Sequence, residues 1–265
     1  RPKIRTLLSA FITLLNDRLG ETIVFPLLPF LLERFATNGS TLGLLAGTYA
    51  ISQFAVAPLI GALSDRFGRK PIIISCVAGS VIGLSLFAIT ISIDWSEALP
   101  IWGISTPLIL LFLARVIDGA SGGTAATATA VLADVSTPEN RAKTFGLIGV
   151  AFGLGFVLGP GLGTALAKFS VIVPVWAATL FAISNLIVVI WILPETLPLA
   201  SRSALGRKRE LNPFVQLRNV FSNPLSRRLC LAFFVFFMAF NGFTAVLVLY
   251  LKEAFSWSPQ QSSQA

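Results

Sequence analysis

Seven long apolar runs constrain the fold of this 265-residue chain more than any other feature. The hydrocarbon core of a bilayer is about 30 Å thick, and a helix needs roughly 20 apolar residues to cross it. Continuous runs of this length predict transmembrane helices, because strands of a membrane barrel alternate between apolar and polar residues. The predicted spans are about 7–30, 43–62, 71–93, 104–131, 145–167, 172–194 and 229–251.

Composition supports the same class. Hydrophobic residues make up 55% of the chain and charged residues 12%, with a mean hydropathy of +0.82. A soluble domain is about one quarter charged. We therefore predict an all-α, multi-pass integral membrane protein whose main partner is the lipid bilayer.

The positive charges are unevenly placed along the chain. The formal net charge is +8, and 15 of the 20 lysines and arginines lie in alternate connecting segments, whereas the other connections hold only Arg34 and Lys168. This bias predicts a cytoplasmic N-terminus and a cytoplasmic long basic loop. We take a plasma (inner) membrane as the default location. The same bias argues against a nucleic-acid partner. The 15 residues are Arg1, Lys3, Arg5, Arg66, Arg69, Lys70, Arg141, Lys143, Arg202, Arg207, Lys208, Arg209, Arg218, Arg227 and Arg228.

Residue types that serve catalysis or metal binding are scarce. The chain has no histidine, so any proton chemistry must use carboxylates. Cys76 and Cys230 both lie in apolar runs, where a free thiol is favoured over a disulfide. There is no nucleophile–base pair and no metal-ligand spacing. We expect no enzyme, no cofactor and no metal site.

A short basic loop separates the second and third apolar runs. Its sequence from residue 61 to 71 is G-A-L-S-D-R-F-G-R-K-P, and it resembles the signature loop G-x-L-x-D-R-x-G-R-K of the major facilitator superfamily. The resemblance implies a major facilitator fold, transport by alternating access and a gating role for the charges at the cytoplasmic ends of the spans. For Arg66 and Lys70 a simple topology signal is the alternative. The expected gating residues are Gly61, Asp65, Arg66, Gly68, Arg69 and Asp134.

Within this resemblance the chain divides into three parts. Residues 1–196 hold six spans and form the expected N-terminal bundle, 197–228 form a cytoplasmic central loop, and 229–265 hold the first helix of a truncated second bundle. In the loop, Asn212-Pro213 is typical of a helix start. Phe214, Leu217 and Phe221 then share one face, which predicts an interfacial helix on the membrane surface. A docking site for a regulatory partner is the alternative.

Charged residues inside the first and fourth spans need a functional or structural reason. A charge at the bilayer centre costs about 2.5–3.5 kcal/mol on insertion scales. Asp17 and Glu21 lie four residues apart on one helix face, and Arg115 and Asp118 lie three apart on another. We expect a buried ionic cluster in which Asp17 pairs with Arg115 and couples proton binding to conformation. A purely structural salt bridge is the alternative. For Arg18 the structural interpretation is favoured, either as a local pair with Glu21 or because the helix begins later than predicted.

Further motifs narrow the resemblance to the twelve-helix drug/proton antiporters, which include tetracycline exporters. It implies that Asp17 and Arg115 handle substrate and protons. The chain departs from the pattern at Arg18, Glu21 and Asp118, which puts tetracycline in doubt and favours a polar or charged substrate. The matching residues are Asp17, Gly20, Pro26 and Pro29, the run Tyr49-Ala-x-x-Gln53-Phe, the run Leu132-Ala-Asp134-Val, and the run from Arg141 to Gly146.

The fifth span carries glycines at a helical spacing. Gly155, Gly159 and Gly163 recur every four residues and form a face that lets another backbone come close. Pro160 removes a helix hydrogen bond and permits a bend. The run resembles the antiporter motif G-x-x-x-G-P-x-x-G. An ordinary close-packed helix pair is the alternative.

The sequence therefore predicts a monomeric secondary transporter that exports a small organic compound in exchange for protons. Asp17 is the expected proton acceptor, with Glu21 or Asp118 sharing the proton. Asn16 and Gln53 are expected to offer hydrogen bonds to the substrate in the cavity. Two alternatives stay open, namely a facilitator or symporter that imports a metabolite, and a non-transporting membrane receptor or scaffold.

Overall fold

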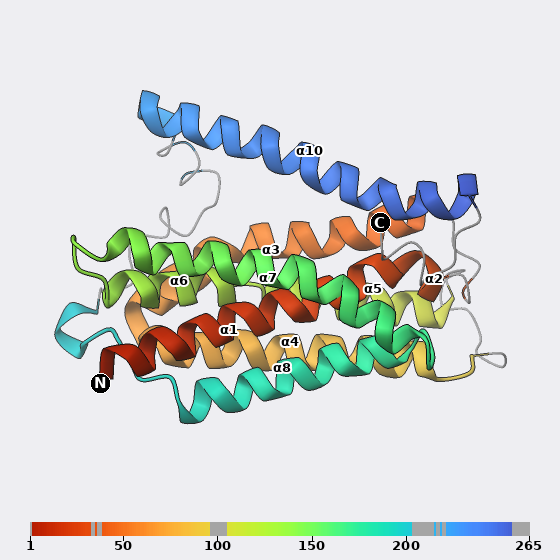
Figure 1. Ribbon diagram of the computed structural model, residues 1–265, viewed down its shortest axis with the longest axis horizontal. Coiled ribbons are helices and arrows are strands. Elements are labelled where there is room, and N and C mark those ends of the chain that lie inside the picture. The colour runs from red at the N-terminus through yellow and green to blue at the C-terminus, as the bar shows by residue number, and fades with distance from the viewer. Residues whose placement is uncertain are drawn as a thin grey trace.

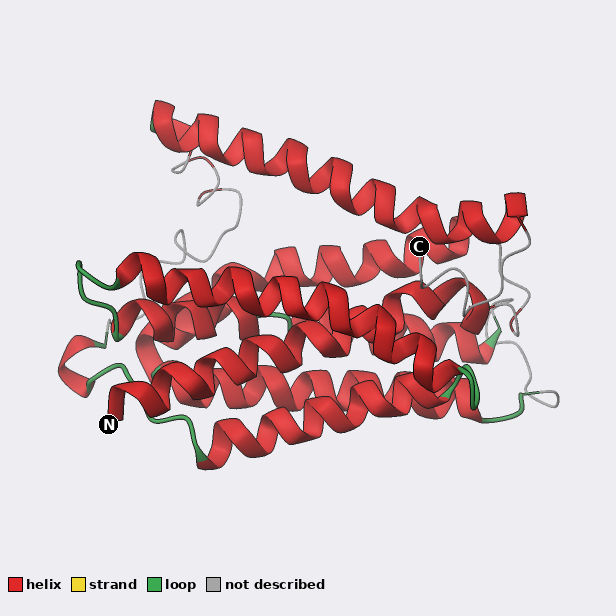
Figure 2. Cartoon of the chain, viewed as in Figure 1, coloured by secondary structure: helices red, strands yellow, loops and turns green. Residues whose placement is uncertain are grey.

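The structure is a computed structural model that describes residues 2–32, 35, 39–95, 105–202, 215, 218 and 221–255, and these parts are helical apart from short turns and loops (Figure 2). The elements are α1 (Pro2–Val24), the 3-10 helix η1 (Phe25–Leu27), α2 (Leu28–Leu32), α3 (Gly39–Phe67), α4 (Arg69–Ser92), α5 (Thr106–Ala120), α6 (Thr124–Asp134), α7 (Arg141–Ala167), α8 (Val173–Trp191), the 3-10 helix η3 (Leu199–Ser201) and α10 (Pro224–Phe255).

Helices coincide with all seven predicted spans, so the predicted all-α membrane fold is confirmed. Six helical segments of the described chain, counting α5 and α6 as one, are long and apolar enough to cross a membrane. The first helix, α1, is not among the six and carries Asp17, Arg18 and Glu21 in its C-terminal third. After α1, Pro26 lacks a backbone N–H, and the chain passes through η1 before it continues as α2.

The fourth span differs from the prediction of one continuous helix. A turn over 121–123 separates α5 from α6, at a stretch rich in glycine, the weakest helix former after proline. The surroundings also require glycine, because a Cβ at Gly119 would lie 2.4 Å from the carbonyl oxygen of Tyr49 on α3. The Gln53 Nε2 donates a hydrogen bond of 3.0 Å to the carbonyl of Gly122. The Gln53 side chain of α3 thus supplies a hydrogen bond to a backbone carbonyl at the break between α5 and α6.

The helix α1 runs through the interior of the bundle. It packs mainly against α7 and α8, while α4 packs against α5 and α8, and α3 packs against α5 (Figure 1). The last helix, α10, runs along one side of the bundle with most of its side chains exposed. The ring of Phe240 on α10 meets the ring of Phe156 on α7 edge to face, with centroids 5.5 Å apart.

Two apolar clusters fill the bundle, one toward each end. Three helices contribute to both clusters. Two of them run in the same sense: α1 contributes Leu14 to one cluster and Ile23 to the other, and α4 contributes Ile73 and Phe87 in turn. The helix α8 runs in the opposite sense and contributes Val175 to the second cluster before it reaches the first. Between the clusters, all three helices carry polar or small residues. The bundle therefore has a polar layer sandwiched between two hydrophobic ones.

Two observations bear on the boundaries of the three predicted parts. The helix α10 begins at Pro224, five residues before the predicted start at Leu229. The expected interfacial helix stays a prediction, because 203–214 and 216–217 lie outside the described residues. The thiols of Cys76, which is buried, and of Cys230 are both free, as the sequence favoured.

A charged cavity at the centre of the bundle

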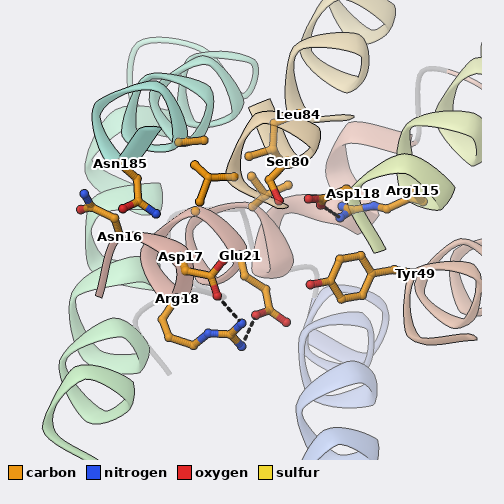
Figure 3. A pocket seen from close by; sticks show the side chains of 14 residues that line it. Asn16, Asp17, Arg18, Glu21, Tyr49, Ser80, Leu84, Arg115, Asp118 and Asn185 are labelled. Atoms are coloured by element: carbon orange, nitrogen blue, oxygen red, sulfur yellow. Dashed lines mark hydrogen bonds and ion pairs between the residues drawn. The ribbon is translucent and has the colours of Figure 1, made fainter. Parts of the chain in front are cut away.

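The polar layer encloses a cavity of about 40 Å³ (Figure 3). A single water needs about 10–15 Å³ measured in this way, so the cavity holds only a few waters. The cavity lies about midway along the helices, because two of its lining residues, Ser80 and Ala182, lie at the midpoints of α4 and α8. The lining residues are Asn16, Asp17, Arg18, Gly20, Glu21, Val24, Tyr49, Val77, Ser80, Leu84, Arg115, Asp118, Ala182 and Asn185.

One turn of α1 supplies three of the five charges. The guanidinium of Arg18 lies between two carboxylates: its Nη2 is 2.7 Å from Asp17 Oδ2, and its Nη1 pairs with Glu21 (Figure 3). The Arg18 guanidinium also lies over the ring of Phe152, 4.9 Å from its centroid. Side-chain exposure is 14% for Arg18, 15% for Asp17 and 38% for Glu21. Glu21 is thus the most accessible member of this triplet.

The remaining two charges come from α5. The Arg115 Nη1 lies 3.8 Å from Asp118 Oδ2, and the Arg115 guanidinium covers the ring of Phe87 at 4.8 Å from its centroid. Both side chains are about as buried as Asp17 and Arg18, at 14% and 15% exposure. This pair of opposite charges lies across the cavity from the triplet of α1.

The predicted ion pair between Asp17 and Arg115 is wrong in this structure. Asp17 pairs with Arg18, the next residue in the chain, and Arg115 pairs within its own helix with Asp118. For Arg115 the physical reason is that Asp118 lies three residues away on the same helix face, whereas a partner on another helix depends on helix packing. The predicted local pair between Arg18 and Glu21 is confirmed.

The two predicted hydrogen-bonding residues have different locations. Asn16 lines the cavity, as expected. Gln53 does not, because its amide faces the break between α5 and α6 and donates to the Gly122 carbonyl. The sequence gave no signal of this contact, because the break between α5 and α6 was not predicted.

Three polar lining residues were not predicted. Tyr49 was quoted only as part of a motif, and Ser80 and Asn185 are single polar residues in apolar runs. Asn185 is 2% exposed, and its Nδ2 donates to the Thr13 carbonyl at 3.4 Å. Isolated polar residues at the centre of apolar spans were the available signal.

The regularly spaced glycines of α7 face α1. A Cβ would lie 2.7 Å from the Arg18 Cβ at Gly155, 2.0 Å from the Thr22 Oγ1 at Gly159, and 2.7 Å from the Ile23 carbonyl oxygen at Gly163. The Thr22 hydroxyl donates to the Gly155 carbonyl at 2.9 Å. The predicted close approach of another backbone is confirmed, and the partner is the helix that carries Asp17.

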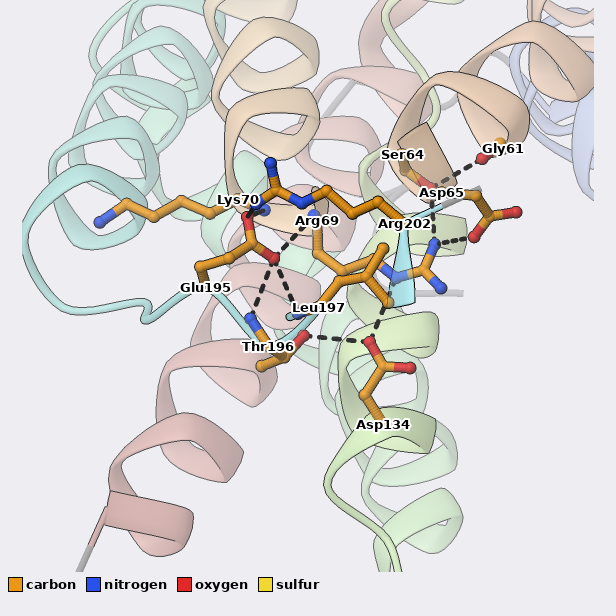
Figure 4. Close-up of polar contacts among 10 residues, drawn as sticks. All are labelled: Gly61, Ser64, Asp65, Arg69, Lys70, Asp134, Glu195, Thr196, Leu197 and Arg202. Atoms are coloured by element: carbon orange, nitrogen blue, oxygen red, sulfur yellow. Dashed lines mark hydrogen bonds and ion pairs between the residues drawn. The ribbon is translucent and has the colours of Figure 1, made fainter. Parts of the chain in front are cut away.

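A second charged cluster lies at the end of the bundle where α3 meets α4 (Figure 4). The Arg69 side chain contacts three acceptors: Nη1 is 2.6 Å from Asp65 Oδ1 and 2.7 Å from Ser64 Oγ, and Nε is 3.2 Å from Asp134 Oδ2. The structure thus brings together Asp65, Arg69 and Asp134, which the sequence grouped. Arg66 lies over the ring of Phe67 instead.

The turn in this cluster is a single glycine. Gly68 has φ of +105°, a backbone conformation that side-chain-bearing residues rarely adopt, and a Cβ there would lie 2.3 Å from Glu195 Oε2. Gly61, by contrast, has open space where a Cβ would be. Of the two glycines in the signature loop, Gly68 is therefore the one that the local geometry requires.

Glu195 closes the cluster and was not predicted as a site residue. Its Oε1 accepts from the backbone N–H of Arg69 at 2.9 Å, and its Oε2 accepts from that of Lys70 at 3.2 Å (Figure 4). A carboxylate at the first turn of α4 satisfies free N–H groups and complements the helix dipole. Thr196 Oγ1 donates to Asp134 Oδ2 at 3.0 Å. The segment after α8 thereby joins the ends of α4 and α6.

Among the described residues, no group of three or more histidine, cysteine, aspartate and glutamate side chains could hold a metal ion.

Membrane-spanning helices packed around a charged central cavity are the architecture of the major facilitator fold. The sequence profile of the Major Facilitator Superfamily matches residues 9–265, and the chain belongs to that family. It is similar to the human Major facilitator superfamily domain-containing protein 10, with 32% identity over 311 residues, covering 99% of this chain and 64% of the relative. It is also similar to the class C tetracycline resistance protein of Escherichia coli, with 31% identity, covering 93% of this chain and 59% of the relative.

Solved structures show the same architecture. The crystal structure of the human organic anion transporter MFSD10 (TETRAN) matches with a TM-score of 0.76 at 31% identity, covering 100% of this chain and 68% of that one. The xylose transporter XylE from Escherichia coli matches with a TM-score of 0.64 at 16% identity, covering 99% of this chain and 66% of that one, which shows the fold alone. The chain spans 64% and 59% of the lengths of the two curated relatives.

Proposed function

We propose that this chain is part of a secondary transporter that exports a small organic compound in exchange for protons. The observation that carries the proposal is the cavity lined by Asp17, Glu21 and Asp118 at the middle of an apolar bundle. Ionisable groups at this depth are costly and serve coupling or substrate binding more often than packing. Relatives named as tetracycline resistance and multidrug resistance proteins support an organic compound as substrate.

In this proposal, protonation of a carboxylate changes the ion pairs of Arg18. One guanidinium holds both Asp17 and Glu21, so protonation of one carboxylate leaves the other as partner. The triplet can therefore accept a proton without leaving Arg18 unpaired, which would be costly in a buried site. The pair of Arg115 and Asp118 offers a second place for the proton across the cavity. Protonation alters these attractions and so shifts the balance between conformations.

The close contact between α1 and α7 would make the two helices move together. Gly155 touches the Cβ of Arg18 and accepts a hydrogen bond from Thr22. A change in the pairing of Arg18 therefore acts on a tightly packed helix pair. Rocking of one bundle against the other about a midplane site is the way in which transporters of this kind alternate access.

The cluster around Arg69 serves as a conformational latch in this proposal. Its contacts join the ends of α3, α4 and α6 and the segment after α8. The basic connecting segments favour a cytoplasmic location for this end, with the N-terminus on the same side of a plasma (inner) membrane. Substrate contact is assigned to the central cavity, where Asn16 and Tyr49 offer hydrogen bonds.

The test uses the complete protein in inverted membrane vesicles loaded with a pH-sensitive dye. A panel of lipophilic cations, tetracyclines and sugars is added to wild type, to Asp17→Asn and to Glu139→Gln. Glu139 is a matched control, because it is fully exposed in the turn between α6 and α7. We expect one compound to release protons from wild type and Glu139→Gln but not from Asp17→Asn. Proton release by Asp17→Asn equal to that of wild type would overturn the assignment of Asp17.

A further inference from the structure

We propose that a file of buried water molecules runs along α1 from the central cavity to the end of the bundle that holds the N-terminus, and that it carries the exchanged proton to that end. The inference rests on the proposed proton exchange and assigns the route by which the proton leaves the cavity. The ligand of the site is water, and its walls are polar side chains of α1 and α8.

One face of α1 is polar from the cavity to the first turns of the helix. Thr6, Ser9, Thr13 and Asn16 follow one another at intervals of three or four residues, which places them on the same face. The first three are at most 4% exposed, and Asn16 lines the cavity. Arg5, the residue before Thr6, is exposed. Buried polar groups therefore connect the cavity with the surface at the start of α1.

The chain on the other side of the cavity is apolar. Leu27, Leu28 and Leu31 are at most 5% exposed and belong to one hydrophobic cluster. The polar face therefore leads from the cavity toward the N-terminal end, where the basic connecting segments favour the cytoplasm. A transporter that exports its substrate in exchange for protons has to release them on this side.

Two groups on this route are buried without a hydrogen-bond partner among the described residues, namely Thr13 Oγ1 and Asn185 Oδ1. Thr13 is 0% and Asn185 2% exposed, and the Asn185 Nδ2 donates to the Thr13 carbonyl at 3.4 Å, so the two residues adjoin each other. Asn185 also lines the cavity, on the same side as Asn16 (Figure 3). A buried water satisfies such groups by making two to four hydrogen bonds to them.

The hydroxyl of Thr13 differs from those of other buried threonines. Thr22, Thr90 and Thr179 donate to the carbonyl four residues earlier in their own helices, at 2.7, 2.7 and 3.0 Å. Thr13 Oγ1 makes no such bond within the part of the chain that the structure describes. Its donor and its lone pairs are therefore available to water.

The spacing of the polar groups suits single waters. With a rise of 1.5 Å per residue, Asn16 and Thr13 lie about 4.5 Å apart along the axis, and Thr13 and Ser9 about 6 Å. Two hydrogen bonds of about 2.8 Å, joined by one water, span either gap. Each water that accepts a proton passes another one on, so no side chain along the route has to ionise. The hydroxyl groups hold the waters in line, because each can both donate and accept.

The test compares Thr13→Val with Thr179→Val in the complete protein. Valine keeps the shape of threonine and removes its hydroxyl, and Thr179 is a matched control because it is 2% exposed but bonded to the Val175 carbonyl. The first measurement is the melting temperature of the purified protein. We expect Thr13→Val to lower it by roughly 2–4 °C through loss of the water. Removal of a hydroxyl that binds nothing would leave the melting temperature unchanged or raise it, and that result would overturn the water site.

The second measurement separates proton movement from substrate movement in vesicles. The probes are ethidium, tetracycline and xylose, and each is followed in proton-coupled exchange and in counterflow, where labelled compound exchanges for unlabelled compound without net proton movement. We expect Thr13→Val to slow proton-coupled exchange at least tenfold and to keep the rate of counterflow, while Thr179→Val keeps both rates. Equal slowing of both modes in Thr13→Val, or slowing of neither, would overturn the route.

The two measurements distinguish failure of the route from failure of the proposed function. Proton exchange by wild type that persists unchanged in Thr13→Val refutes the route alone. Absence of proton exchange in wild type with all three probes refutes the proposed function and with it the proton on this route, and the melting temperature of Thr13→Val then still decides whether the site holds water.

Discussion

Adding one methyl group at Gly159 should destabilise the bundle, whereas adding it at Gly161 should not. Both glycines lie in α7, but a Cβ at Gly159 would lie 2.0 Å from the Oγ1 and 2.7 Å from the Cβ of Thr22, while a Cβ at Gly161 would have no atom within 4 Å. The Thr22 hydroxyl can rotate away, but its Cβ moves only with the backbone of α1. The helix pair would have to separate by about 1 Å to restore ordinary carbon contacts of about 3.5–4.0 Å.

The size of the effect follows from two terms. Alanine in place of glycine favours a helix interior by about 1 kcal/mol at both positions, so this term cancels when the two variants are compared. Forcing an extra methyl group into a packed interior costs about 1–3 kcal/mol. Gly159→Ala should therefore be less stable than Gly161→Ala by about this amount, which corresponds to a melting temperature lower by roughly 2–10 °C.

The assay is thermal unfolding of the purified complete protein, followed by intrinsic fluorescence. Proton exchange in vesicles at a temperature below both transitions shows whether the displaced α1 also impairs coupling through Arg18. Equal melting temperatures for the two variants would refute the inferred packing of α7 on α1. Gly153→Ala, which also meets open space, provides a second control.

Three further predictions concern contacts that the structure identifies. Gly68→Ala should impair folding or expression, since it combines a φ of +105° with a Cβ 2.3 Å from Glu195, and Gly61→Ala should have little effect in the same expression test. Glu195→Gln should lower the free energy of unfolding by about 1–2 kcal/mol through loss of charge at the start of α4, and a denaturation midpoint equal to wild type would contradict that role. Gln53→Ala should lower the free energy of unfolding by about 1–3 kcal/mol, because the Gly122 carbonyl loses its hydrogen-bond donor. Substrate affinity should change less in Gln53→Ala than in Asn16→Ala, and a larger loss of affinity in Gln53→Ala would indicate that Gln53 contacts the substrate.

Sequence patterns alone determined the membrane class, the helical spans and the family resemblance of this protein. Hydrophobic run length and the charges of the connecting segments are local properties, and each is read without knowing how helices pack. The charges at positions 17, 21, 115 and 118 were also found this way, because an ionisable residue in an apolar span stands out against its neighbours. All four line the same cavity.

Only the tertiary structure decided the partners of these groups and of Gln53 and Glu195, apart from the local pair of Arg18 and Glu21, which the sequence predicted. Asp17 pairs with Arg18 rather than Arg115, and Gln53 serves the break in the fourth span rather than the cavity. Glu195 meets Arg69 across more than a hundred residues, a contact that no local pattern contains. Ion pairs and hydrogen bonds depend on distances of a few ångströms between side chains, and those distances are set by the rotation and spacing of packed helices, which the order of residues along one helix does not specify.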